Sequence, residues 1–408
     1  MENYTEITAF PYGTVSAPPS KSAAHRSLIC AALAGAGSKV SNLELSKDIE
    51  ATLRCIKAMG GEYNFENGSL EIIKGITKPK NGIELDCGES GSTLRFFIPI
   101  AAAFGTEVTF VGAKRLFERP LQPYYDTFKD RGIDLFAEGD SLTVTGRLGK
   151  GLYILAGNVS SQFVTGLLLS LGIVGGGEVR ISTPLESQGY VDLTIAQMKL
   201  FGVQVTNDNY SSFMVANGGF KPYETVIEGD YSNGAFMLGA AALGAKVAVS
   251  GLNPNSAQGD KAFLDFLESV GARVVVNSSG ALQVEVDIDV SQIPDLVPPI
   301  AAVLCFCKGK SHILNAARLR LKESDRLQTV KLELQHLGAI ISEKDDGLEI
   351  EGVENLVGGK CETHNDHRIA MMCALAAIKC KSSVYVDNSA CVEKSYPSFW
   401  KDFCKKVY

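Results

Sequence analysis

A glycine recurs along this chain at a nearly constant spacing, each time directly after a short apolar stretch. The glycines are 72, 70, 69 and 67 residues apart, which is a period of about 70 residues. Helices commonly end at a residue in the left-handed conformation, which Gly adopts without steric cost. The repeat therefore predicts a helix that ends just before each of these residues, which are Gly60, Gly132, Gly202, Gly271 and Gly338.

The segments that flank these helices complete a supersecondary unit. Residues 272–276, which follow Gly271, are short and β-branched and are predicted to form a strand. Upstream of each helix lie an Ala/Leu-rich segment and a further strand, as at 244–249. Each copy then has the order strand, helix, strand, helix, strand, strand. A sixth copy begins at Phe399 and is cut short by the end of the sequence, so six copies predict an α/β protein of two three-unit domains.

Chain length also favours two domains, because 408 residues exceed what one hydrophobic core usually supports. We expect the crossing near Gly229, between the third and fourth copies. The strand before Gly13 is assigned to the second half, where it supplies what the shortened last copy lacks. The predicted domains are 14–226 and 1–13 plus 227–408, with the Pro18-Pro19 pair as a linker.

Composition excludes several classes of function. A net charge of −7 argues against a nucleic-acid partner, which requires a broad basic face. The 10 cysteines show no paired spacing of a zinc or redox site and are predicted to be buried, reduced thiols. The N-terminus lacks the features of a secretory signal, and the longest apolar runs are shorter than the roughly 20 residues that span a bilayer. We expect a cytoplasmic protein without a membrane partner.

Three polar motifs in the first half stand where the chain enters a helix. Ser20-Lys21-Ser22 with Arg26 leads into a helix expected at 27–33, where Ser20 or Ser22 can be the cap and free N–H groups can bind an anion. The Gly/Ser turn at 88–95 lacks the ending of a nucleotide-binding P-loop. Residues 158–163 include two serine hydroxyls and the Gln162 amide. Each motif also fits an ordinary helix cap, with Lys21 and Arg26 as surface cations.

The second half carries two further motifs of this kind. Residues 322–326, Lys-Glu-Ser-Asp-Arg, combine both signs of charge and also fit a solvated salt-bridge face. In 365–368, Asn-Asp-His-Arg, Asn365 or Asp366 can be a plain N-cap, and His367 is expected to be structural. The sequence has no metal-ligand spacing, so no metal site is predicted. It also has no GxSxG motif, so no nucleophilic serine is predicted. Together with Arg119 and Lys394, these cations in an acidic chain favour an enzyme with small, multiply anionic substrates.

Taken in order, the motifs resemble the enolpyruvyl transferases over essentially the whole chain. The resemblance implies two similar domains of three βαβαββ units, an inside-out α/β barrel fold, with the substrate cleft between them. The sequence departs from the family pattern at Ser92, Phe96, Ala24-His25 and Arg318, and none of these removes a required charge. The marks of the resemblance are Ser20–Ser22 with Arg26, Gly91-Ser92 with Arg95, Glu118–Pro120, Ser160–Gln162, Ile293–Asp295, Lys322–Arg326 and Asn365–Arg368.

The resemblance implies transfer of the enolpyruvyl group of phosphoenolpyruvate to the 5-hydroxyl of shikimate 3-phosphate, with release of phosphate. These two small molecules are the expected partners, the enzyme is expected to be a monomer, and no cofactor is implied. The residues implied for shikimate 3-phosphate are Lys21, Ser22, Arg26, Ser160, Ser161, Gln162, Ser187, Asp295 and Lys322. Those implied for phosphoenolpyruvate are Lys21, Gly91, Arg119, Gln162, Arg326, Arg368 and Lys394.

The same resemblance implies three catalytic residues. Asp295 accepts the proton of the 5-hydroxyl, and Glu323 gives and later retrieves the proton of the methylene carbon. Lys21 protonates the departing phosphate oxygen. Positioned acid–base groups of this kind each accelerate a reaction by about 10²- to 10⁴-fold. The division of roles between Asp295 and Glu323 is the least constrained part of this hypothesis.

Two alternatives from other classes are weighed against this one. The sibling enzyme that acts on UDP-N-acetylglucosamine carries a Cys on the loop that corresponds to 112–117, which contains none here. That branch also lacks the Asn-Asp-His-Arg motif. A non-catalytic scaffold of repeats would have no reason to place Asp295 and Glu323 among cations. The sequence therefore favours the enzyme that acts on shikimate 3-phosphate.

Overall fold

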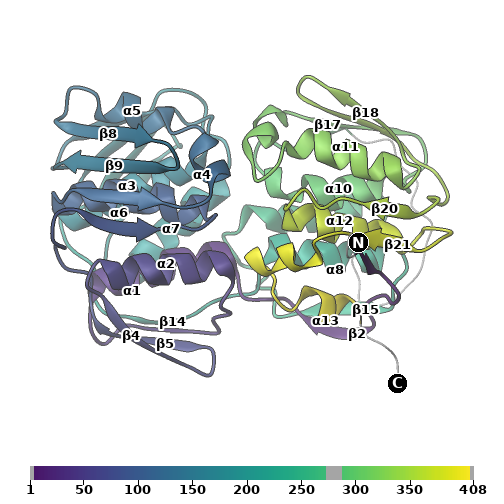
Figure 1. Cartoon of the computed structure of the whole chain (residues 1–408), viewed down its shortest axis with the longest axis horizontal. Coiled ribbons are helices and arrows are strands. Elements are labelled where there is room, and N and C mark those ends of the chain that lie inside the picture. The colour runs from purple at the N-terminus through teal and green to yellow at the C-terminus, as the bar shows by residue number, and fades with distance from the viewer. Residues whose placement is uncertain (1–3, 273–286, 405–408) are drawn as a thin grey trace. The chain divides into compact units, whose positions relative to one another are not determined.

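The chain forms two compact units in the computed structural model, which describes residues 4–272 and 287–404 (Figure 1). The N-terminal unit is Pro19–Glu228. The C-terminal unit combines Met1–Pro18 with Gly229–Tyr408. The boundaries expected from the repeat, after residues 13 and 226, lie within five residues of these.

The N-terminal unit contains three repeats of four strands each, with two helices in the first and third repeats and three in the second. In each sheet the first two strands are parallel, and the fourth strand lies antiparallel between the second and the third. The first repeat comprises β14 (Glu224–Val226), α1 (Lys21–Ala34), β3 (Lys39–Ser41), α2 (Lys47–Ala58), β4 (Glu62–Glu66) and β5 (Ser69–Lys74). Its opening strand β14 thus comes from the end of the unit.

The other two repeats of this unit follow chain order. The second comprises β6 (Ile83–Asp86), α3 (Gly91–Phe104), β7 (Val108–Val111), α4 (Lys114–Glu118), α5 (Gln122–Phe128), β8 (Ile133–Glu138) and β9 (Ser141–Gly146). The third comprises β10 (Leu152–Leu155), α6 (Ser161–Val174), β11 (Gly177–Ile181), α7 (Gln188–Leu200), β12 (Val205–Asp208) and β13 (Ser212–Val215).

The C-terminal unit repeats the pattern, and its middle repeat has the same sheet order. That repeat comprises β16 (Asp287–Asp289), η2 (Pro294–Leu296), α10 (Val297–Leu304), β17 (Lys310–Leu314), η3 (Ala317–Leu321), α11 (Arg326–His336), β18 (Ile340–Lys344) and β19 (Gly347–Glu351). The repeat before it comprises β2 (Gly13–Ser16), α8 (Tyr231–Ala242), β15 (Val247–Ser250), η1 (Gly259–Lys261) and α9 (Ala262–Ser269). The strand expected at 272–276 lies, from residue 273 on, outside the described residues.

The N-terminal residues take part in the last repeat of the C-terminal unit. Strand β1 (Thr5–Glu6) pairs antiparallel with β21 (Val384–Val386), which is parallel to β20 (Gly359–Cys361). The helical elements of this repeat are α12 (His367–Ala377), η4 (Ser389–Lys394) and α13 (Phe399–Phe403). The edge that the shortened sixth copy does not provide is thus formed by a segment more than 370 residues earlier in the chain.

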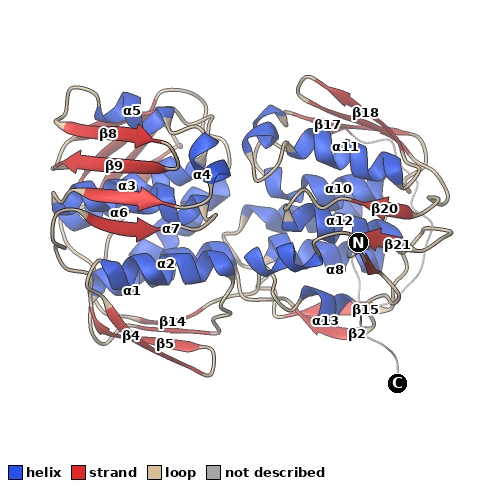
Figure 2. Cartoon of the chain, viewed as in Figure 1, coloured by secondary structure: helices blue, strands red, loops and turns tan. Residues whose placement is uncertain are grey.

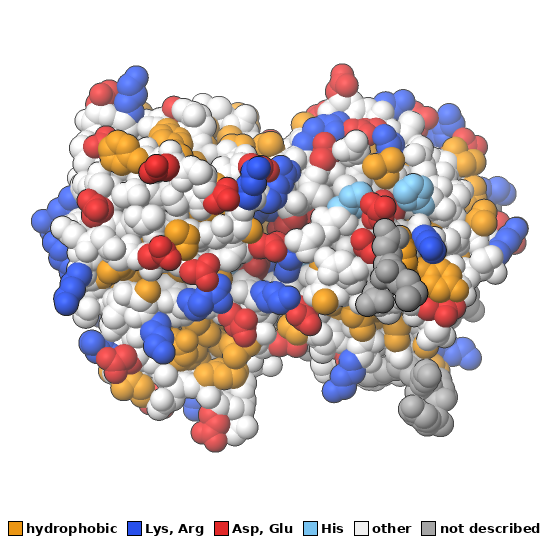
Figure 3. Space-filling model, viewed as in Figure 1, with side chains coloured by type: hydrophobic (Ala, Val, Ile, Leu, Met, Phe, Trp, Pro, Cys, Tyr) orange, Lys and Arg blue, Asp and Glu red, His pale blue; other side chains and the backbone are white. Residues whose placement is uncertain are grey.

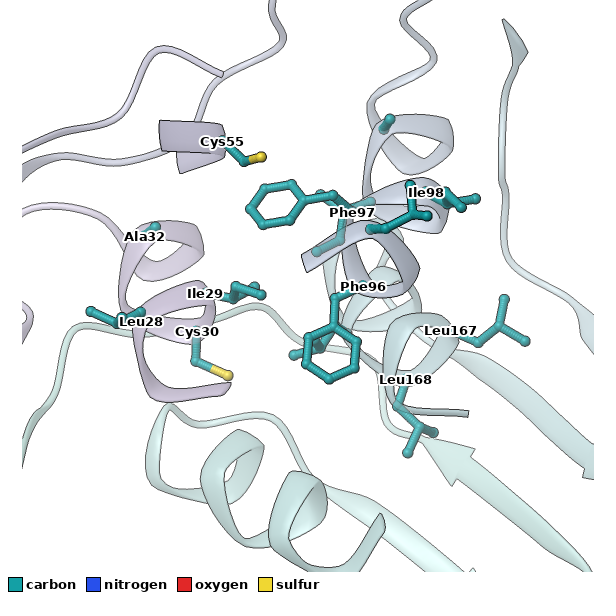
Figure 4. Packing of buried hydrophobic residues seen from close by; sticks show 14 of the residues in the cluster. Leu28, Ile29, Cys30, Ala32, Cys55, Phe96, Phe97, Ile98, Leu167 and Leu168 are labelled. Atoms are coloured by element: carbon teal, nitrogen blue, oxygen red, sulfur yellow. The ribbon is translucent and has the colours of Figure 1, made fainter. Parts of the chain in front are cut away.

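Each unit has its own hydrophobic core, which is built mainly of helices. Helices α3, α6 and α12 are buried on nearly all sides, as expected of helices that are apolar all round. Figure 2 shows helices at the centre of each unit and strands toward its margin. In the N-terminal unit, Figure 4 shows Ile29 of α1 beside Phe96 and Phe97 of α3, with Leu168 of α6 nearby. Two units built in this way agree with the two-domain α/β fold that the resemblance implies.

The repeated glycines have the conformation that the sequence predicts. Their φ angles are 84°, 68°, 84°, 80° and 95°, in chain order. A helix ends two residues before each of Gly60, Gly202, Gly271 and Gly338, whereas α5 ends at Phe128, four residues before Gly132. The expected helix at 27–33 is wrong in its start, because α1 begins at Lys21. Ser20 is the N-cap, and its hydroxyl accepts a hydrogen bond from the Ala23 N–H at 3.4 Å. Ser20 is one of the two expected caps, but the helix starts six residues earlier than expected, so Arg26 is inside it.

The predicted burial of the cysteine thiols is confirmed for most of them. All ten cysteines are free thiols, and eight of them are buried. On the face shown in Figure 3, basic and acidic side chains are interspersed over both units. In residues 4–272 and 287–404, no helix has the length and apolar character needed to cross a membrane.

Candidate functional site

The first basic group of the N-terminal unit lies at the start of α1. Lys21 is the first helical residue, and its Nζ lies 2.8 Å from Asp48 Oδ2 in the first turn of α2. Both side chains are mostly buried, with 16% and 15% of their surface exposed. A cation at a helix N-terminus opposes the helix dipole, and the Asp48 carboxylate offsets that repulsion. The pair therefore fixes the Lys21 amine at a helix start.

Arg26, one turn further along α1, connects this helix to α6 and α7. Its Nε donates to Thr194 Oγ1 at 2.7 Å, and Nη2 donates to Thr165 Oγ1 at 3.3 Å and to the Tyr190 carbonyl at 3.1 Å. Nη1 donates to the Ser22 carbonyl at 2.7 Å. Burial lowers the pKa of Arg26 to about 10. These partners are neutral oxygens, so they orient the guanidinium and leave its positive charge in place.

A second group forms where α3 and α6 begin. Arg95 Nη1 donates to Gln162 Oε1 at 2.6 Å, and Gln162 Nε2 donates to Ser92 Oγ at 2.9 Å. A Cβ atom on Gly91 would lie 2.7 Å from Arg119 Nη1 and 3.2 Å from Arg95 Nη1. No side chain fits there without displacing a guanidinium. Glycine at the start of α3 is therefore required for the close approach of both arginines.

Besides Ser22, three further predicted serines of this unit stand at helix starts. Ser160 is the N-cap of α6, and its hydroxyl accepts from the Gln162 N–H at 3.3 Å. Ser161 is the first residue of that helix. Ser187 precedes α7 in the left-handed region, with φ 57°, an uncommon and strained conformation for a residue with a side chain. The Ser187 carbonyl accepts a hydrogen bond from the Tyr190 N–H. The carbonyl of Tyr190 in turn accepts from Arg26 Nη2, so Ser187 lies one turn before a residue that orients Arg26.

We call this set the N-terminal cluster. Its defining residues are Lys21, Ser22, Arg26, Gly91, Arg95, Arg119, Ser160, Ser161, Gln162 and Ser187.

In the C-terminal unit, three cations surround the Asp295 carboxylate, which lies in η2 before α10. Its Oδ1 accepts from Lys322 Nζ at 3.2 Å and from Arg326 Nη1 at 2.9 Å. Arg368 Nη2 is 3.4 Å from Oδ2, and Arg368 Nη1 donates to the Asp295 carbonyl. Burial alone would raise the pKa of Asp295, but Arg368, Lys322 and Arg326 hold it well below its usual value.

Arg326 is the most enclosed charge of this group, with 1% of its side chain exposed. Its Nε lies 2.9 Å from Asp366 Oδ2, and its Nη2 lies 2.6 Å from Glu323 Oε2. Burial lowers the pKa of Arg326, but the carboxylates of Asp366, Glu323 and Asp295 outweigh this effect and raise it above its usual value. Arg326 therefore holds three carboxylates around one guanidinium.

The residues just before α12 position the remaining cations, Arg368 and Lys394. Asp366 is the N-cap of α12 and accepts from the Arg368 N–H at 3.0 Å, so it anchors Arg368 and Arg326 at once. Lys394, at the end of η4, donates from Nζ to the Asn365 carbonyl at 2.6 Å. We call this set the C-terminal cluster, and its defining residues are Asp295, Lys322, Glu323, Arg326, Asp366, Arg368 and Lys394.

The arrangement has a clear chemical meaning. Lys21, Arg326 and Arg368 lie in the first turns of their helices, where the helix dipole disfavours a cation by roughly 0.3–1 kcal/mol. A bound anion would turn this unfavourable term into a favourable one, because helix N-termini and arginine forks both suit phosphate and carboxylate groups. Within the described residues, no group of three or more His, Cys, Asp and Glu side chains is placed to hold a metal ion.

Several residues of both clusters were not singled out from the sequence. Asp48 and Asp366 were missed as counter-ions, although Asp366 was expected as a possible cap. Arg95 was noticed in its motif but received no role. The carbonyl of Asn365 was missed because a backbone acceptor leaves no mark in the side-chain pattern. The signal that could have found the two aspartates is their position in the first turn or cap of a helix that follows a basic motif.

Three comparisons place the chain among known proteins. A family model described as EPSP synthase (3-phosphoshikimate 1-carboxyvinyltransferase) matches residues 9–403. The chain is 43% identical over 403 residues to the 3-phosphoshikimate 1-carboxyvinyltransferase of Clostridium perfringens (strain SM101), covering 96% of this chain and 95% of that protein. It is 44% identical over 405 residues to the protein of the same name from Clostridium kluyveri, with 96% and 94% coverage.

Among solved structures, the fold is similar to that of EPSP synthase from Acinetobacter baumannii. The TM-score is 0.78 at 23% sequence identity, and the match covers 98% of this chain and 96% of the other. At that identity the likeness shows a shared fold.

Proposed function

Because the chain belongs to the EPSP synthase family, we propose that its two clusters serve the two substrates of one transfer reaction. The chain is an enzyme of the shikimate pathway, and it transfers the enolpyruvyl group of phosphoenolpyruvate to the 5-hydroxyl of shikimate 3-phosphate. Phosphate is released in this reaction. What remains to be assigned is the part that each residue of the clusters takes.

We assign shikimate 3-phosphate mainly to the N-terminal cluster. Hydroxyl groups at helix starts and the guanidinium of Arg26 suit a ligand that carries hydroxyls, a carboxylate and a phosphate. The residues assigned to it are Lys21, Ser22, Arg26, Ser160, Ser161, Gln162 and Ser187, together with Asp295 and Lys322 of the other unit.

We assign phosphoenolpyruvate to cations of both clusters. Its phosphate and carboxylate are close together, so binding requires several positive charges in one place. Arginine forks match both groups in shape, and lysines add compact charge. The residues assigned to it are Lys21, Gly91, Arg119, Gln162, Arg326, Arg368 and Lys394.

The observation that carries this assignment is the environment of Asp295. Without substrate, its carboxylate is the shared counter-ion of Lys322, Arg326 and Arg368, and its low pKa makes it a weak proton acceptor. A substrate anion that engages Arg326 and Arg368 takes over part of their charge. The pKa of Asp295 then rises, because fewer positive charges stabilise its ionised form. Substrate binding thereby prepares Asp295 to accept the proton of the 5-hydroxyl.

Glu323 is assigned the proton of the methylene carbon. Once a substrate anion engages Arg326, the Glu323 carboxylate is less stabilised and takes up a proton from solvent. In the addition step that proton forms the new C–H bond, the 5-oxygen bonds to the neighbouring cation-like carbon, and Asp295 takes the hydroxyl proton. In the elimination step Glu323 retrieves a proton from the methyl group as the carbon–oxygen bond to phosphate breaks. Lys21 protonates the departing phosphate. Contact with Arg326 at 2.6 Å keeps the Glu323 carboxyl within the cluster.

The test is an assay of phosphate release. The protein is mixed with phosphoenolpyruvate and one of three additions: shikimate 3-phosphate, UDP-N-acetylglucosamine or no acceptor. We expect release with shikimate 3-phosphate alone. Release with the nucleotide sugar, or equal release without acceptor, would contradict the assignment. Monomeric state, a cytoplasmic location, the absence of a nucleic-acid partner and independence from metal ions stay predictions.

A further inference from the structure

A buried carboxylate outside both clusters gathers three hydrogen-bond donors. Glu333 lies in α11 with 1% of its side chain exposed. Its Oε1 is 2.7 Å from His364 Nε2, and its Oε2 is 3.1 Å from His336 Nδ1. Oε2 also accepts from the Glu362 N–H at 2.9 Å. An ionised carboxylate offers acceptors alone, so each ring nitrogen that contacts it donates a proton.

The same helix holds one loop at two points. Arg326 and Glu333 are seven residues apart, about two helical turns, and therefore lie on the same face of α11 roughly 10 Å from each other. Arg326 binds the Asp366 carboxylate at one end of loop 362–366. Glu333 binds the Glu362 N–H and the His364 ring toward the other end. The loop is thus fixed to α11 by two charged side chains.

This loop has a conformation that needs such support. His364 and Asn365 are consecutive residues in the left-handed region, with φ angles of 50° and 53°. Side chains make this region unfavourable, so it persists where the surroundings hold it. The Asn365 carbonyl accepts from Lys394 Nζ at 2.6 Å, and Asn365 Oδ1 accepts from Asn388 Nδ2 at 3.1 Å. The direction of that carbonyl, and with it the place of the Lys394 amine, depends on the loop.

We infer that Glu333, acting through His364, is a positioning residue for phosphoenolpyruvate binding. It holds the loop whose Asn365 carbonyl fixes Lys394 and whose Asp366 carboxylate fixes Arg326 and Arg368. The inference rests on the proposed function, in which these three cations bind phosphoenolpyruvate. Glu333 itself does not contact a member of the C-terminal cluster in the hydrogen bonds described above, so its effect passes through the loop.

The test uses two variants that remove the anchor in different ways. Glu333→Leu keeps the approximate side-chain volume and removes every acceptor. His364→Asn removes the ring, and Asn tolerates the left-handed region better than most residues. Each variant is expected to raise the KM for phosphoenolpyruvate about tenfold or more, since small misplacements in an active site have large effects. The Kd of shikimate 3-phosphate should stay within about twofold, because most of its assigned contacts are elsewhere.

Two controls separate positioning from general structural damage. His336→Asn removes the other histidine on Glu333, which is 53% exposed and belongs to α11 rather than to the loop. It is expected to leave the KM unchanged. Glu333→Gln should restore near-normal KM, because its amide oxygen can accept from the Glu362 N–H while its NH₂ donates to the other tautomer of His364. A loss of folded protein would lower kcat without changing KM.

The outcomes distinguish this inference from the function on which it rests. Lys394→Met is measured in parallel, and the proposed function requires it to raise the KM for phosphoenolpyruvate. If Lys394→Met does so and His364→Asn stays within about twofold of wild type, the positioning role of Glu333 is overturned and the proposed function stands. If Lys394→Met has no effect, the proposed binding set is wrong. Should Glu333→Leu fail to fold, His364→Asn decides alone.

Discussion

The two clusters hold their arginines by different chemistry. Arg26 in the N-terminal unit is surrounded by hydroxyl and carbonyl oxygens, whereas Arg326 in the C-terminal unit is surrounded by three carboxylates. Burial lowers the pKa of Arg26 to about 10, whereas the carboxylates outweigh burial and raise that of Arg326. Neutral partners orient a cation without cancelling its charge. Carboxylate partners cancel it, and in the proposed mechanism a substrate anion competes with them and so links binding to proton transfer.

The largest effect is expected from Glu323→Gln in the C-terminal cluster. If Glu323 carries the methylene proton, kcat should fall by about 10²- to 10⁴-fold while the Kd of shikimate 3-phosphate changes little. If Glu323 is merely half of an ion pair with Arg326, which keeps its contacts with Asp295 and Asp366, the change lowers stability and leaves turnover intact. Phosphate release and a titration with shikimate 3-phosphate measure both quantities. Near-normal turnover would end the catalytic assignment.

Next in size is the effect of Arg326→Met on stability. Removing this buried guanidinium takes the shared counter-ion from three carboxylates, of which Asp295 keeps Lys322 and Arg368. We expect the free energy of unfolding to fall by about 3–5 kcal/mol. The matched control is Arg320→Met. Arg320 also contacts two carboxylates, Asp325 and Glu343, but is 32% exposed, so its loss should cost about 1 kcal/mol or less. Urea denaturation measures the free energy of unfolding of both variants. Equal losses would show that burial does not make the Arg326 network contribute more to stability than the exposed Arg320 contacts.

Arg26→Met should separate stability from binding in the N-terminal cluster. The hydroxyls of Thr165 and Thr194 are 2.7 Å apart and still bond to each other when the guanidinium is absent. The loss of stability should therefore be about 1 kcal/mol, smaller than for Arg326→Met. The Kd of shikimate 3-phosphate should nevertheless rise about tenfold or more. A loss of stability as large as that of Arg326→Met would erase the proposed difference between the clusters.

The smallest expected effect is the acid response of Asp295. Its folded-state pKa lies below the unfolded value of about 3.9, so its ionised form contributes stability at neutral pH. That contribution is present above the unfolded pKa and is lost as the pH falls through the folded one. Asp295→Asn should remove this part of the acid dependence. Below about pH 4, its free energy of unfolding should therefore change less with pH than that of wild type. An equal pH dependence of stability in the variant and in wild type would show that the three cations do not stabilise the ionised form of Asp295.

The fold was predictable because its main signal is local. A glycine that ends a helix needs no distant partner, and all five repeat glycines have the expected left-handed conformation. Helix starts were harder, since Ser20 and Ser22 both satisfy the capping pattern and the tertiary contacts of Arg26 lie 139 to 168 residues away. The local pattern therefore located the repeats but misplaced helix boundaries such as the start of α1.

The cations of the site could be predicted from the sequence, whereas the carboxylates that pair with them could not. Basic motifs at helix starts were visible in the sequence, but Lys21 pairs with Asp48 across 27 residues and Arg326 pairs with Asp366 across 40. Glu333 lies in an unremarkable stretch of α11, and its meaning depends on a loop almost 30 residues later. Pairings of this kind follow from tertiary packing, which no spacing rule in a single sequence supplies.

The division of labour between the clusters is tested most directly by Arg368→Ala. The Arg368 guanidinium contacts both the carboxylate and the backbone carbonyl of Asp295, and Arg368 is assigned to phosphoenolpyruvate. Steady-state assays of phosphate release give the KM for phosphoenolpyruvate, and a separate titration gives the Kd of shikimate 3-phosphate. We predict that the KM rises about tenfold or more while the Kd stays within about twofold of wild type. An unchanged KM, or an equal loss of affinity for both substrates, would contradict it.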